Sequence, residues 1–114
     1  MKKIKNVKEA IEIIIETSIS HARANRFRNF KLANKSFDKR EKALEFLKVN
    51  NSIGQLSGLL YHNDDSVKLY SAQVLLDTDF NKKSIKALKE LEKKSGPVSF
   101  MAKCNLMEHK EHRR

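Results

Sequence analysis

Apolar residues recur at intervals of three and four along most of this chain, which is the spacing of an α-helix. No stretch alternates apolar and polar residues for long enough to predict a strand, and positions 1–53 contain neither glycine nor proline. We therefore predict an all-α fold with about six helices. The 114 residues have no linker that would divide them, so we expect one helical domain over 1–114.

The first fifty residues predict two long helices joined by a short polar turn. The first begins after Asn6, which is placed to form a capping box with Glu9, and ends near Arg23. Two helices connected so closely form an antiparallel hairpin. The apolar side of the first helix comprises Val7, Ile11, Ile14, Ile15 and Ala22.

The second helix is expected over 27–49. Asn50 and Asn51 end it, because asparagine tolerates the left-handed backbone of a helix C-terminus. Its repeat of apolar residues predicts a narrow buried seam made of Phe30, Ala33, Phe37, Leu44 and Leu47.

Shorter helices follow in the second half. A capping box at Ser52 and Gln55 opens one, Asp64 and Asp65 suit the positive N-terminus of the next, and another follows Asn81. Pro97 fits the first turn of a last helix. These helices form two similar pairs about thirty residues apart, judged by the spacing of Leu59 and Leu88 and of Ala72 and Ala102.

The segment LLYHNDDSVKLYSAQVLL (59–76) resembles a HEAT repeat unit, with a leucine-rich helix, an acidic turn and a Val-basic-x-x-x-Ala helix. More widely, residues 7–47, with the motif Lys31-Leu32-Ala33-Asn34-Lys35, followed by that unit are similar to a small family of bacterial helical proteins. That family resembles immunity proteins of polymorphic toxin systems, including contact-dependent growth inhibition. The resemblance implies a cytoplasmic protein that binds and blocks a cognate toxin domain.

No arrangement of residues predicts catalysis, a metal or a cofactor. His109 and His112 share a helix face but lack further ligands, so a frayed polar terminus is the simpler interpretation. Cys104, the one cysteine, has no base or positive helix end beside it in sequence, and a structural thiol is the default. The paired aspartates in the turns are explained by helix N-termini. We expect a binding protein and not an enzyme.

Basic residues are the clearest functional signal. Lys and Arg number 24 against 14 Asp and Glu, a net charge of +10, which favours an anionic partner. A second group of lysines over 82–94 is typical of a solvated face. The candidate partner-binding residues cluster around the first turn and continue along the second helix: Arg23, Arg26, Arg28, Lys31, Lys35 and Lys42.

Three functions remain open, in the order immunity protein, RNA- or DNA-binding module, and enzyme. The charge weighs against the first, because an inhibitor that mimics the substrate of a nuclease toxin is acidic. This chain needs instead an acidic toxin surface, or an interface away from the phosphate-binding groove. Against nucleic acid, Phe30 and Phe37 are expected in the core, where they cannot stack on bases. No segment is long and apolar enough to predict membrane insertion.

The last helix is apolar on two sides, and a helix of that kind is normally covered on two sides. A terminal unit of a repeat stack has no following neighbour to cover it. We therefore predict a protein–protein interface, in a homo-oligomer or with the partner, bordered by Phe100, Met101, Cys104 and Met107.

Overall fold

The computed structural model of the chain describes residues 3–112, and of His112 only the backbone. In that range the chain forms five α-helices and one 3-10 helix and has no strand, which confirms the all-α prediction and the number of helices. The elements, in order, are α1 (Val7–Arg26), α2 (Phe30–Val49), η1 (Ile53–Tyr61), α3 (Asp65–Leu75), α4 (Asn81–Glu92) and α5 (Pro97–His112).

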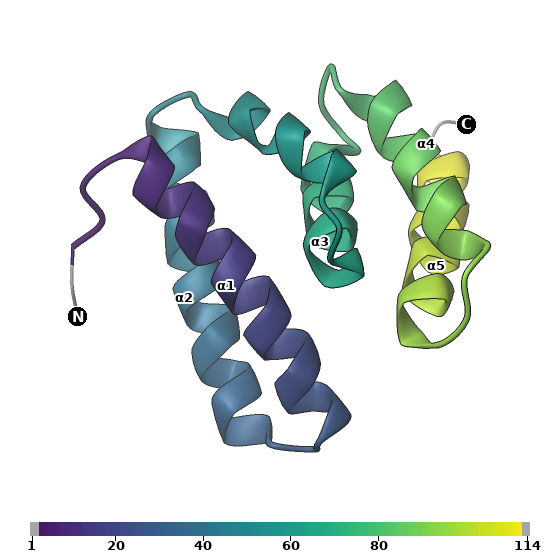
Figure 1. Cartoon of the computed structure of the whole chain (residues 1–114). Coiled ribbons are helices and arrows are strands. Elements are labelled where there is room, and N and C mark those ends of the chain that lie inside the picture. Colours follow the sequence, from purple (N-terminus) through teal and green to yellow (C-terminus); the bar gives the residue numbers. More distant parts are fainter. Residues whose placement is uncertain (1–2, 113–114) are drawn as a thin grey trace. The chain divides into compact units, whose positions relative to one another are not determined.

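The chain divides into two compact units, with the boundary between Gln55 and Leu56. The first unit is the antiparallel hairpin of α1 and α2, which lie side by side over their whole length (Figure 1). The second contains α3, α4 and α5, each of which contacts the other two. The prediction of a single domain over 1–114 stays a prediction.

The predicted caps at Asn6 and Asn51 are confirmed, but α2 begins at Phe30 instead of the predicted residue 27, because Phe27 caps the C-terminus of α1 and Asn29 caps α2. The Asn6 side chain accepts a hydrogen bond from the backbone N–H of Glu9 at 2.8 Å, as a helix cap does. At the end of α2, Asn51 adopts the left-handed conformation with φ 53°, and the N–H of Ser52 donates to the carbonyl of Leu47. The first helix extends one turn beyond the predicted Arg23 and ends at Arg26.

The predicted seam of α2 is partly wrong, because Phe30 and Phe37 are 63% and 44% exposed. At about 3.6 residues per turn, both lie to one side of the face that α2 buries. The spacing prediction failed because small residues let the two backbones approach, and a phenylalanine at the centre would hold them apart. The buried face of α2 consists of Ala33, Ser36, Ala43, Leu44 and Leu47.

The buried face of α1 that packs against α2 has smaller and more polar side chains than predicted. Its buried residues are Ala10, Ile14, Thr17, Ser18 and Ala24. The Thr17 hydroxyl is satisfied by the carbonyl of Ile13 in its own helix, so this polar side chain can be buried. Only Ile14 of the predicted apolar side is fully buried, and the other four residues are half-buried.

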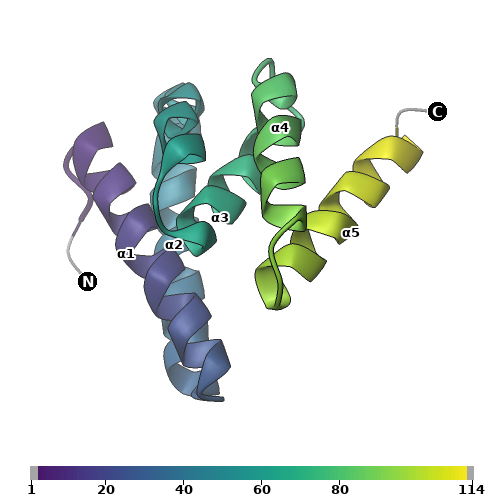
Figure 2. The same ribbon diagram turned by 45° about the vertical axis from the view of Figure 1, so that its right-hand side comes forward.

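In the second unit, the helices α3, α4 and α5 pack on one another (Figure 2). Their leucines and alanines form the core, including Leu75, Leu88, Leu91 and Ala102. Polar pairs join the helices around it. Lys68 of α3 forms an ion pair with Glu90 of α4 at 2.7 Å, and Gln73 donates a hydrogen bond to Asn105 of α5 at 2.9 Å.

The first HEAT-like pair departs from prediction in its first helix, which is a 3-10 helix. Gly54 and Gly58 lower the helix propensity of this short segment. The expected capping box is not formed as predicted, since the Ser52 hydroxyl donates to the carbonyl of Asn50 instead.

Candidate functional site

The turn between α1 and α2 gathers exposed basic residues from both helices. Arg23 and Arg26 lie in the last turn of α1, Arg28 lies in the connection, and Lys31 lies in the first turn of α2. Lys35 and Lys42 continue along α2. All six predicted partner-binding residues are exposed. We call residues 23–31 the hairpin tip.

Two phenylalanines are exposed among these charges. Phe27, the residue that caps the C-terminus of α1, is 73% exposed, and Phe30 begins α2 close beside it. Aromatic residues and arginine are the types that protein interfaces concentrate, and they supply many of the residues that dominate binding energy. The hairpin tip therefore has the composition of a binding surface, in place of the purely basic stripe that the sequence predicts.

Arg28 holds a left-handed backbone conformation, with φ 57°. Arg28 ends α1 in a Schellman motif. The backbone N–H of Asn29 donates to the carbonyl of Ala24 at 2.8 Å, and the N–H of Arg28 donates to the carbonyl of Asn25 at 3.1 Å. Glycine is the usual residue there, because a Cβ atom costs about 1 kcal/mol in this conformation. An arginine in so unfavourable a position points to a role for its side chain.

A second cluster lies on the side of the hairpin, where α1 faces α2. The rings of His21 and Phe37 are 6.3 Å apart between centroids, and the Arg40 guanidinium carbon lies 5.9 Å from the centre of the Phe37 ring. The Asn25 side-chain nitrogen lies 3.4 Å from the His21 ring nitrogens. These contacts keep Phe37 beside the helix pair although 44% of it is exposed.

Burial lowers the pKa of His21 below its usual 6.5, and the nearby positive charge of Arg40 lowers it further. The unfolded chain then takes up this proton at a higher pH than the folded one. The stability that neutral His21 contributes is complete above about pH 6.5 and is lost as the pH falls through the lowered folded-state pKa. We expect the urea midpoint of the chain to fall on acidification, and to fall less in His21→Gln. Parallel pH profiles for the two proteins would contradict this.

The predicted α5 interface residues are accessible. Phe100 and Met107 are 66% and 62% exposed, Met101 is exposed and Cys104 is half-buried with a free thiol. Phe100, Cys104 and Met107 are spaced by four and three residues, so they lie on one side of the helix, away from buried Ala102. That they form an interface, with a second copy or a partner, stays a prediction.

The acidic pair before α3 has a local structural role, whereas the predicted role of Asp77 and Asp79 at the N-terminus of α4 is wrong, because Phe80 is the N-cap there and no side chain caps the helix. The Asp64 carboxylate caps α3 by accepting hydrogen bonds from the N–H groups of Ser66 and Val67. Asp65 forms an ion pair with Lys94 at 2.7 Å, which uses one charge of the second lysine group. Among residues 3–112, no three His, Cys, Asp or Glu side chains are grouped closely enough to hold a metal ion. The His112 side chain lies outside the described part of the chain.

The hairpin tip could be foreseen only in part from the sequence. Its charges are evident there, but the sequence predicts Phe30 as the first residue of the buried seam and singles out no role for Phe27. Ala33, Ser36 and Ala43, which recur at helical spacing and are small enough for close helix packing, are the signal that could have placed the phenylalanines outside.

Comparison of the chain with models of protein families, with curated proteins and with solved structures found no match. Within the described residues, no helix combines the length and the apolar character that crossing a membrane requires.

Proposed function

We propose that this chain is an immunity protein, which binds a cognate bacterial toxin domain in the cytoplasm and blocks it. The observation that carries the proposal is the hairpin tip, where exposed Phe27 and Phe30 stand among exposed arginines. The similarity of residues 7–47 with the following unit to a family of bacterial helical proteins that resembles immunity proteins supports the same function.

The charge of the chain defines the toxin surface that this function needs. At +10, the inhibitor requires an acidic face on the toxin, and arginine pairs with carboxylates through two parallel hydrogen bonds. Phe27 and Phe30 fill apolar depressions within that face, where burial supplies most of the affinity. The toxin is blocked because the helical hairpin covers its working surface, and no chemistry by the inhibitor is needed.

The test is protection of a bacterial host from the toxin domain encoded by the gene immediately upstream. Co-expression of this chain should restore growth, and the two purified proteins should form a complex. Arg28→Gly provides a sharp variant, because glycine suits the left-handed position and should stabilise the fold by about 1 kcal/mol while it removes a binding side chain. We expect a more stable protein that protects less well. Absence of both complex and protection contradicts the proposal.

A second candidate function, binding of single-stranded RNA or DNA, is favoured by the exposure of Phe30 and Phe37. They lie seven residues apart on α2, about 10.5 Å along the helix axis, and could each stack on a base. Lys31, Lys35 and Lys42 are exposed along the same helix and could contact phosphates. This function predicts an affinity that falls steeply with salt.

A further inference from the structure

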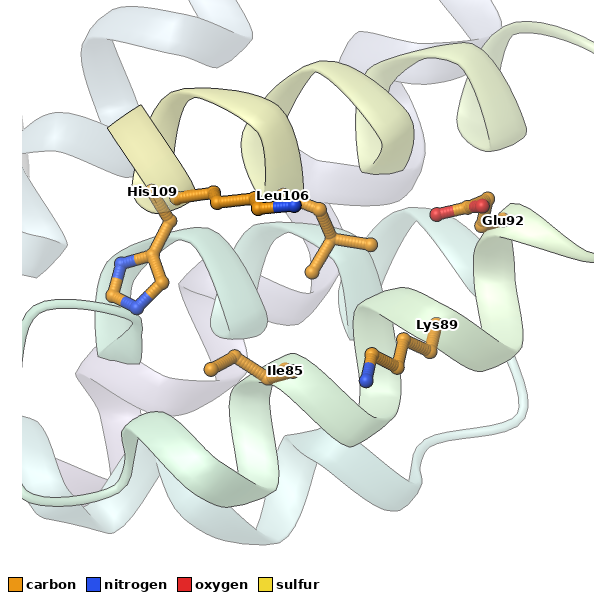
Figure 3. Close-up of a pocket in the computed structure, with 6 residues that line it drawn as sticks. Ile85, Lys89, Glu92, Leu106 and His109 are labelled. Atoms are coloured by element: carbon orange, nitrogen blue, oxygen red, sulfur yellow. The ribbon is translucent and has the colours of Figure 1, made fainter. Parts of the chain in front are cut away.

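The second unit contains an open groove of about 560 Å³ between α4 and α5. Ile85 and Leu106 face each other across its middle, while His109 lies at one end and Glu92 at the other (Figure 3). Lys89 and Lys110 complete the lining. All of these residues belong to one compact unit.

The middle of the groove is apolar and its rim is basic. Ile85 and Leu106 are only half-buried, so apolar surface that a partner could cover remains open to solvent. Lys89 and Lys110 are exposed, and together they outweigh the single negative charge of Glu92. His109 closes one end of the groove, and its Nε2 atom is buried without a hydrogen-bond partner among the described residues.

The place of the groove in the fold indicates what kind of structure fits it. The groove runs between two packed helices, α4 and α5, and a groove of this kind is a surface that the apolar face of an amphipathic helix can fill. The volume accommodates a few side chains of leucine size. A second copy of this chain is disfavoured, because each copy carries +10.

We propose that the α4–α5 groove binds an amphipathic helix of a partner protein. Apolar side chains of that helix lie between Ile85 and Leu106, and acidic residues on its flanks pair with Lys89 and Lys110. This surface is separate from the hairpin tip and does not depend on the immunity function. It gives the chain a second point of attachment, which raises the overall affinity for any partner that reaches both surfaces.

The experiment uses the full chain and a synthetic amphipathic helix with leucines on one face and glutamates on both flanks. Saturable binding is expected, with NMR shifts concentrated at Ile85, Leu106 and His109. The double variant Lys89→Glu/Lys110→Glu should weaken binding about tenfold or more, because two attractive contacts become repulsive. The same variant should bind a peptide with lysines in place of the glutamates more tightly than the wild type does.

The matched control is Lys82→Glu/Lys83→Glu, which reverses two exposed lysines of α4 that lie outside the groove. It has the same net charge as the test variant and should retain wild-type affinity. Three results overturn the proposal: no saturable binding, equal weakening by both double variants, or shifts that fall on the exposed Phe100 and Met107 instead of the groove.

Discussion

Replacement of Arg23, Arg26 and Arg28 together by glutamate should weaken binding of the physiological partner by about a hundredfold or more and leave the helical fold intact. All three side chains are exposed, and the contact between α1 and α2 is made by other residues. Like charges brought together at an interface cost several kcal/mol, and each 1.4 kcal/mol is tenfold in affinity. Affinity would be measured by titration calorimetry and the fold by far-UV circular dichroism.

The control for this variant must carry the same change in total charge. Three reversals lower the net charge by six, from +10 to +4. Lys82→Glu/Lys83→Glu/Lys86→Glu does the same on exposed positions of α4. If the hairpin tip is the binding surface, only the arginine variant loses affinity. A folded arginine variant that binds at wild-type strength would remove the hairpin tip from the proposal.

The salt dependence of binding distinguishes a nucleic-acid partner from a protein partner. If the protein neutralises about six phosphates of a single-stranded oligonucleotide, binding should weaken roughly 300-fold between 50 and 200 mM salt. A protein complex centred on Phe27 and Phe30 should change much less, because burial of apolar surface is not screened. A flat salt response with an oligonucleotide eliminates the nucleic-acid candidate.

Helix positions were predictable because local chemistry decides them. Asn6, Asp64 and Pro97 begin helices through their own side chains, and Asn51 ends one through its tolerance of a left-handed backbone. The packing face of each helix is settled by its neighbour instead. In the hairpin, Ala33 and Ser36 are buried and Phe30 is not, because close approach of two backbones favours small side chains over large apolar ones.

The candidate site was predictable to a similar extent. Charge is a property of composition, so Arg23, Arg26 and Arg28 stand out in the sequence. The backbone conformation of Arg28 could not be read there, because a turn of Arg26, Phe27, Arg28 and Asn29 contains no glycine to mark the left-handed position. The α4–α5 groove depends on the pairing of two helices, and Ile85 alone looks like an ordinary core residue.

Leu47→Ala should destabilise the chain by about 2–5 kcal/mol, while Phe30→Ala should change its stability by less than about 1 kcal/mol. Leu47 is fully buried, so its removal leaves a cavity between packed groups. Phe30 is 63% exposed, and little of its contact is lost on truncation. Urea unfolding followed by circular dichroism measures both values on the same scale.

This pair of variants also tests whether Phe30 contributes to binding and Leu47 to stability. If Phe30 belonged to a buried seam, its truncation would cost about 3–5 kcal/mol, as for other core phenylalanines. The exposed position predicts the opposite behaviour, a Phe30→Ala protein that is as stable as the wild type and binds its partner poorly. Leu47→Ala, where it remains folded at low temperature, should keep its affinity, because Leu47 lies on the face of α2 that packs inside the protein. A loss of stability in Phe30→Ala equal to that in Leu47→Ala would return Phe30 to the core and leave the hairpin tip without one of its two phenylalanines.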